Sequence, residues 1–106
     1  MNDLICQILA APRVMADFSG SLSDALNFGF SYVESEDNMV AFLVASPNTV
    51  LKILREIDEA VLDPDDKALG TLWTAKILCS KKLPENRVIF ANESLLTVLL
   101  IDRTET

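Results

Sequence analysis

Few side chains in this sequence are of the types that carry out catalysis, and they are spread along the chain. Asp63, Asp65 and Asp66 form the one grouping that could attract a cation. A calcium-binding EF-hand loop needs ligands at alternate positions, a central glycine and a distal glutamate, and this segment lacks that spacing. We therefore predict a solvated turn in which Asp63 or Asp65 makes local hydrogen bonds. A cation-binding loop that serves as an accessory to an enzyme is an alternative.

The two cysteines, Cys6 and Cys79, are far apart and have no Cys-X-X-Cys spacing, so we expect buried, reduced thiols. The chain contains no histidine, which removes Ser-His and Cys-His catalysis and most zinc sites. Its three glycines do not form a phosphate-binding loop. The sequence therefore predicts a protein that is not an enzyme, with no catalytic residue, cofactor or metal.

Composition sets the broad class. The 106 residues fit one domain, and a chain that is 50% hydrophobic and 24% charged is able to bury a core. A net charge of −7 argues against a nucleic-acid partner, whose affinity depends on clustered Lys and Arg. The longest apolar runs are far shorter than a membrane span, and the first residues do not resemble a secretory signal. We therefore expect a cytoplasmic protein with no membrane contact.

Helical periodicity predicts three helices. The first covers residues 3–11, with an apolar stripe that either reaches over a neighbouring chain or docks on its own chain. The second runs from Leu22 to about Val33, after a capping box, and its Gly29 either weakens the helix or permits close approach of another element. The third begins at Pro47, after the N-cap Ser46, and is expected to end at residue 62.

Strand-like runs cover residues 39–45, 72–80, 87–91 and 95–101, and a turn at residues 83–86 separates the second from the third. In that turn Asn86 can adopt positive φ at low cost. The predicted fold class is α+β, with a small central sheet of about four strands packed by two to three helices. We expect a single domain over residues 1–106, with an N-terminal helical part at 1–38 and an α+β core at 39–102.

Three aromatic side chains, Phe28, Phe30 and Tyr32, leave little of the second helix polar. An exposed aromatic flank is typical of surfaces that bind a partner, so these residues form a candidate partner surface. The alternative is a helix that is buried on two sides.

Several short motifs occur in an order that is known from one family. A buried strand is followed by the helix that starts at Pro47, then by Gly70-Thr-Leu-Trp73, by Leu83-Pro-Glu-Asn86 and by the strand Val88–Asn92. Residues 39–92 thereby resemble the A-domain of the tailed-bacteriophage major capsid and encapsulin shell fold. Thr74 and Asn86 stand where that family commonly has glycine. The residues that carry the likeness are Pro47, Gly70, Leu72, Trp73, Pro84 and Asn86.

The resemblance covers about half of the chain, and 106 residues cannot hold the other parts of a shell protein. It implies an A-domain-only, encapsulin-like structural protein that self-associates or forms part of a shell. The implied partners are further copies of the chain or other shell or cargo proteins, in the cytoplasm or in a virion or shell. The alternative function is a small cytosolic adaptor domain that binds a protein and has no shell role.

Overall fold

The computed structural model describes residues 2–35, 38–65 and 68–104, and in these ranges the chain forms three helices and one seven-stranded sheet. The helices are α1 (Asn2–Ala10), α2 (Leu22–Ser35) and α3 (Pro47–Glu56). The strands are β1 (Val14–Ser19), β2 (Phe42–Ala45), β3 (Ala60–Leu62), β4 (Gly70–Leu72), β5 (Ala75–Cys79), β6 (Arg87–Ala91) and β7 (Val98–Thr104). The fold is broadly α+β, but the predicted sheet of about four strands is wrong.

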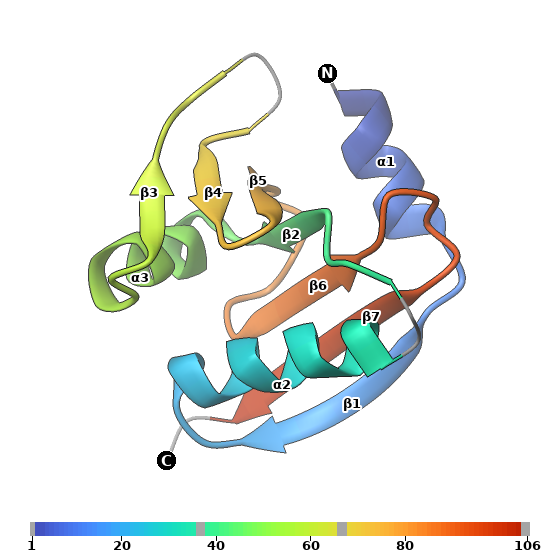
Figure 1. Cartoon of the computed structure of the whole chain (residues 1–106), viewed down its shortest axis with the longest axis horizontal. Helices are drawn as coiled ribbons and strands as arrows, with labels where there is room; N and C mark the ends of the chain where they lie inside the picture. Colours follow the sequence, from blue (N-terminus) through green and yellow to red (C-terminus); the bar gives the residue numbers. More distant parts are fainter. Residues whose placement is uncertain (1, 36–37, 66–67, 105–106) are drawn as a thin grey trace.

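The strand order of the sheet is β1-β7-β6-β2-β5-β4-β3. β1 pairs parallel to β7 and β2 pairs parallel to β5, and the other neighbours are antiparallel. Figure 1 shows β1 and β3 at opposite sides of the molecule. The described sheet is thus open, with an edge strand at each end.

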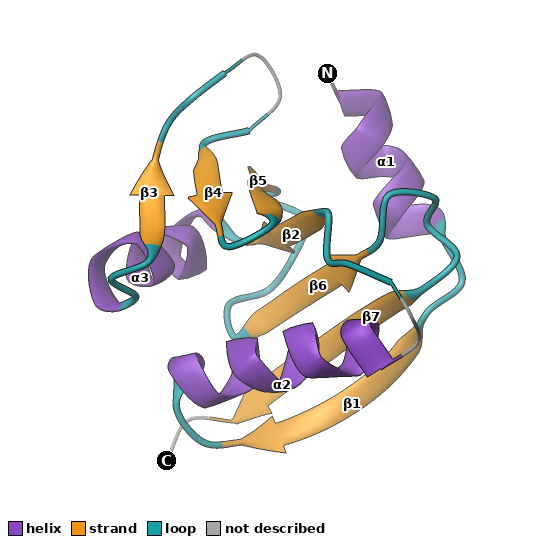
Figure 2. Cartoon of the chain, in the orientation of Figure 1, coloured by secondary structure: helices purple, strands orange, loops and turns teal. Residues whose placement is uncertain are grey.

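Helices pack against both faces of the sheet, and Figure 2 shows the helices in purple and the strands in orange. One face packs against α2 and α3, and the other packs against α1. The first core cluster includes Leu26, Phe30, Leu43, Ile53, Phe90 and Ile101. The second includes Ile8, Val44, Leu78, Ile89 and Leu100. Because Ile8 is fully buried there, α1 docks on its own sheet.

The two helix starts for which the sequence predicted a capping serine are confirmed. The Ser21 hydroxyl accepts a hydrogen bond from the Asp24 amide (3.1 Å), and the Ser46 hydroxyl accepts one from the Thr49 amide (3.3 Å). Pro47 is the first residue of α3, where its missing N–H costs nothing. These short polar side chains satisfy amides that the helix itself leaves unpaired.

The predicted end of the third helix is wrong. α3 stops at Glu56, and Ile57 follows in an extended conformation with φ −103° and ψ 110°. Ala60–Leu62 then form β3 and pair with β4. Helical spacing continued through this segment, but strand pairing satisfied its backbone groups.

The predicted strand over residues 72–80 is confirmed over β5, but a turn separates Leu72 from it. β4 and β5 are antiparallel, with Leu72 paired to Ala75, so Trp73 and Thr74 form a two-residue turn. Trp73 has a φ of +52°, which a bulky residue rarely adopts. Gly70 begins β4 where a β-carbon would lie 2.1 Å from the Val61 carbonyl oxygen, so only glycine fits.

Three further strands differ from the prediction, and the first is β2, which begins at Phe42 rather than at Met39. β1 lies in the N-terminal part, for which the sequence predicted helices only. β7 begins at Val98 rather than at Leu95, which has a φ of +60°, and it extends to Thr104. β6 covers the predicted residues 87–91. The N-terminal part therefore belongs to the same sheet as the rest of the chain.

Candidate functional site

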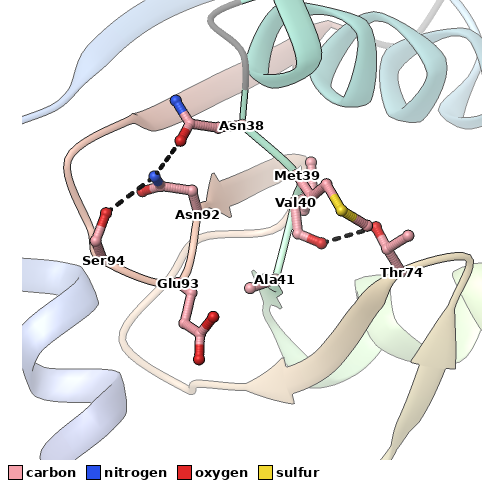
Figure 3. A pocket seen from close by; sticks show the side chains of 8 residues that line it. All are labelled: Asn38, Met39, Val40, Ala41, Thr74, Asn92, Glu93 and Ser94. Carbon is pink, nitrogen blue, oxygen red and sulfur yellow. Dashed lines mark hydrogen bonds between the residues drawn. The ribbon is translucent and has the colours of Figure 1, made fainter.

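A pocket of about 580 Å³ lies where the segment before β2, the β4–β5 turn and the segment after β6 meet (Figure 3). The Thr74 hydroxyl donates to the Val40 carbonyl oxygen (2.9 Å) and ties the turn to the segment before β2. The lining residues are Asn38, Met39, Val40, Ala41, Thr74, Asn92, Glu93 and Ser94.

The polar side chains of this pocket are used in holding its walls together. The Asn92 side-chain amide donates to Asn38 Oδ1 (2.9 Å) and to Ser94 Oγ (3.1 Å). Its Oδ1 accepts from the Thr97 amide (3.0 Å), and Asn38 Nδ2 donates to Thr97 Oγ1 (3.1 Å). Asn92 is buried, and both of its amide hydrogens and its oxygen are bonded. This network fixes the turn after β6.

The chemistry available in the pocket is limited. Glu93 is the one ionisable residue among the described lining, and its side chain is exposed. General acid–base catalysis usually needs a second titratable group with a matched pKa. The described lining of the pocket therefore offers its shape and one carboxylate.

Two smaller hollows adjoin the same turn, of about 410 Å³ and 210 Å³, and Thr74 lines both. The smaller one is also lined by Phe30 and Trp73, whose rings meet edge to face with centroids 4.7 Å apart. Trp73 remains 45% exposed. A strained backbone that carries a half-exposed aromatic ring is a feature found at binding sites, so this turn is a candidate contact point.

The three residues of the candidate partner surface have different environments. Phe30 is buried and contacts Phe90, with ring centroids 5.9 Å apart. Tyr32 is half-buried against the core. Phe28 is 41% exposed and stacks on Phe18 (5.6 Å). Of the three predicted residues, Phe28 alone presents much of its ring to solvent.

The residues that carry the family likeness can be placed in the fold. Leu72 is fully buried and Pro84 is exposed in the turn before β6. Asn86 has a φ of +70°, which confirms the predicted left-handed conformation. Its side-chain oxygen accepts a hydrogen bond from Arg103 Nη2 (3.3 Å), and its carbonyl accepts one from the Arg103 amide (2.8 Å).

The aspartate loop contains a local turn. Asp65 Oδ1 accepts a hydrogen bond from the Ala68 amide (2.7 Å), as predicted, and its Oδ2 lies 3.7 Å from Lys76 Nζ. Asp66 lies outside the described residues. Among the described residues, no group of three or more His, Cys, Asp or Glu side chains could hold a metal ion.

The prediction of two buried thiols is wrong for Cys6, which is exposed on α1. Cys79 is half-buried at the end of β5. Burial raises the pKa of the Cys79 thiol, and the positive charge of Lys81 offsets part of that shift. The Cys79 thiol therefore stays protonated at neutral pH and is a poor nucleophile.

The sequence did not predict the sheet edge at β1. Met15 is 61% exposed and Val14 is 49% exposed, although both are large and apolar. In the described sheet β1 has a neighbour on one side only, which is β7. The segment has just one β-branched residue and weak alternation, and the breakers Pro12 and Gly20 that bound it were its best signal. We call this surface, Arg13 with β1, the β1 edge.

Comparisons with known proteins leave the family open, because no protein-family model, curated protein or solved structure matches the chain. They do not test the resemblance to the capsid A-domain. In the described parts of the chain, no helix has the length and apolar character needed to cross a membrane.

Proposed function

We propose that this chain is a structural protein that acts by associating with further copies of itself, and that it is not an enzyme. The observation that carries the proposal is the open sheet, whose two edge strands lie at opposite sides of the molecule with apolar side chains exposed on both. An uncovered edge strand presents unpaired backbone groups, which readily pair with a strand of another chain.

The side chains at these edges support association. On β1, Val14 and Met15 are exposed, and on β3, Val61 and Leu62 are exposed. Exposed apolar residues that are grouped at one edge commonly mark an interaction surface, whereas single ones are ordinary. In the described sheet, each edge therefore combines a side that no neighbouring strand pairs with and exposed apolar side chains.

The pocket of Figure 3 supports a structural function in a different way. Its asparagines bond to each other and to the neighbouring turn, so that little polar capacity remains for a substrate. Burial raises the pKa of the half-buried Cys79 thiol, which therefore gives no activated nucleophile. We accordingly propose no catalytic residue among those that the structure describes.

A narrower form of the proposal is a role in a capsid-like or encapsulin-like shell, with other shell or cargo proteins as partners. It depends on the motif resemblance alone. A cytosolic location belongs to this proposal as well.

Sedimentation velocity of the wild-type chain over a range of micromolar concentrations tests self-association. We expect a defined oligomer whose fraction rises with concentration, and negative-stain microscopy would reveal closed particles if they form. A strict monomer at every concentration would overturn the proposal.

A second candidate function is a small adaptor that binds another protein through an aromatic surface. The half-exposed rings of Phe28 and Trp73 favour it, since aromatic residues are enriched at interface hot spots. Here a discrete partner would be captured by the wild-type chain and lost with Phe28→Lys. Retention of the same partner by Met15→Lys would separate this surface from the β1 edge.

A further inference from the structure

The two edges of the sheet are not equally open. β1 has six residues and β3 has three. Native proteins protect edge strands by making them short or by placing lysine or proline in them. β3 is short, whereas Val14–Ser19 contains neither lysine nor proline. The β1 edge is therefore the more available of the two for pairing with another strand.

The backbone of the β1 edge faces outward at alternate residues. The Gly20 amide donates to the Thr104 carbonyl of β7 (3.4 Å), so the Ser19 carbonyl on the other side of that trans peptide points away from β7. Because this direction alternates along a strand, the N–H and C=O groups of Arg13, Met15 and Asp17 face the free edge. Pro12 is an even-numbered residue and belongs to the set that faces β7. Its missing N–H therefore does not interrupt the free edge.

The same three residues share one face of the sheet. Ala16 and Phe18 pack with the core cluster under α2, which places the side chains of the odd-numbered residues on the face that carries α1. A contact of Arg13 supports this placement on the face that carries α1. Its Nη1 donates a hydrogen bond to the Leu9 carbonyl oxygen of α1 (2.8 Å). That bond uses one of five guanidinium donors.

Asp17 has a like charge beside it, and no cation within the described ranges pairs with its carboxylate. Its register partner on β7 is Asp102, and Asp102 Oδ2 is bonded by Arg87 Nη2 at 3.4 Å. No ion pair or side-chain hydrogen bond of Asp17 occurs within the described residues. A cation from outside the chain, placed across the free edge, would complement the Asp17 carboxylate.

We infer that the β1 edge pairs with β1 of a second copy of this chain, antiparallel, with Arg13 of each copy opposite Asp17 of the other. Met15 then lies opposite Met15 on the two-fold axis, and the two sheets join into one. The inference rests on the proposed function and names the interface that self-association uses. The arrangement is isologous, because each copy contributes the same residues.

Charge favours this register over the two that place the axis further along β1. A shift that puts Ala16 on the axis sets Asp17 opposite Met15 and leaves Arg13 opposite Ser19. A shift that puts Asp17 on the axis sets two carboxylates directly opposite each other, which is destabilising. The register with Met15 on the axis forms two Arg–Asp pairs and buries two methionine side chains that are exposed in one copy.

A charge swap tests the pairing. In sedimentation measurements, Arg13→Asp and Asp17→Arg should each raise the dimer dissociation constant about tenfold, because like charges then oppose each other twice per dimer. The double variant Arg13→Asp with Asp17→Arg restores opposite charges and should return the dissociation constant to within about threefold of wild type. Leu62→Glu on β3 is the matched control at the other edge. It should leave the dimer dissociation constant unchanged.

Cross-linking tests the register. In a Cys6→Ser, Cys79→Ala background, Met15→Cys should form an intersubunit disulfide on mild oxidation, because paired residues of adjacent strands meet the Cα–Cα spacing of a disulfide. Ser19→Cys, exposed on the same face, should not, because the two copies of residue 19 lie far apart in this register.

The outcomes separate the two proposals. A wild-type chain that never associates overturns both. A wild-type chain that associates with no response to either single charge reversal, and without a Met15→Cys cross-link, retains the proposed function and overturns the β1 interface. Weakening by Leu62→Glu alone would assign the association to β3 instead.

Discussion

Gly29 of α2 lies directly over the ring of Phe90 in β6. A β-carbon at Gly29 would lie 2.4 Å from the Phe90 Cζ atom, which is closer than real carbon atoms approach. The absence of a side chain thus lets α2 pack close to the centre of the sheet. The sequence left open whether Gly29 weakens the helix or permits close approach of another element. In the structure, Gly29 permits close approach of α2 to the ring of Phe90.

Gly29→Ala should lower the free energy of unfolding by about 1–3 kcal/mol, because the added methyl overpacks the core. This sign is opposite to the helix-propensity effect, under which alanine stabilises a helix relative to glycine. Chemical denaturation measures the difference. In a Phe90→Leu background the same change should cost less, and Ser31→Ala on the exposed side of α2 should not destabilise the chain. Stabilisation by Gly29→Ala would show that the helix does not approach the ring closely.

Trp73 should report on its contact with Phe30. Phe30→Leu removes the edge-to-face ring contact, so we expect a loss of about 1–2 kcal/mol of stability and a red-shifted tryptophan emission. Phe28→Leu, on the same helix but outside that contact, is the matched control and should leave the emission unchanged. Because the chain has a single tryptophan, the fluorescence has one source. An unchanged spectrum for Phe30→Leu would contradict the packing described for the β4–β5 turn.

Asn92 should be important for folding rather than for ligand binding. Asn92→Ala removes the acceptor of the Thr97 amide and the hydrogen bond to Asn38 Oδ1, so we expect a loss of about 2–3 kcal/mol of stability. Asn27→Ala, at an exposed position of α2, should change stability by less than about 0.5 kcal/mol. Thermal unfolding compares the two. Equal effects would mean that the network in Figure 3 does not hold the turn after β6.

The two thiols should differ in reactivity. Cys6 is exposed, whereas burial raises the pKa of the Cys79 thiol and reduces its thiolate fraction. Iodoacetamide near pH 8 should therefore alkylate Cys6 first, as mass spectrometry of the modified peptides would show. Faster modification of Cys79 would contradict its placement against the core.

The same pKa shift has a consequence for stability. Above the ordinary thiol pKa of about 8.5, the unfolded chain gives up the Cys79 proton more readily than the folded chain does. The contribution of the protonated Cys79 thiol to the free energy of unfolding is therefore fully present below that pH. It is lost as the pH rises toward the raised folded-state pKa. Cys79→Ala should flatten that part of the stability profile, and an unchanged profile would count against the shift.

Local signals in the sequence predicted much of the fold. Ser21 and Ser46 cap their helices as short polar N-caps do, and Asn86 adopts the left-handed conformation that asparagine tolerates. Each of these features depends on interactions between residues within a few positions of each other. A local sequence pattern is therefore enough to predict them.

The failures were at places where distant pairing decides the structure. Val61 continued a helical pattern but joined β3, and Trp73 continued a strand pattern but became the first residue of a turn with positive φ. β1 pairs with β7 across more than eighty residues, and its own composition gave little strand signal. The candidate interface was missed for the same reason, because an edge strand is defined by its neighbours.

Amide hydrogen exchange at low and high concentration tests the central claim most directly. If β1 pairs with β1 of a second copy, the amides of Arg13, Met15 and Asp17 should become protected as association proceeds. The amides of Ala16 and Phe18, which face β7, should be protected at both concentrations. Unchanged exchange at Met15 and Asp17 in a sample that has associated, or new protection at Leu62 alone, would contradict the β1 interface.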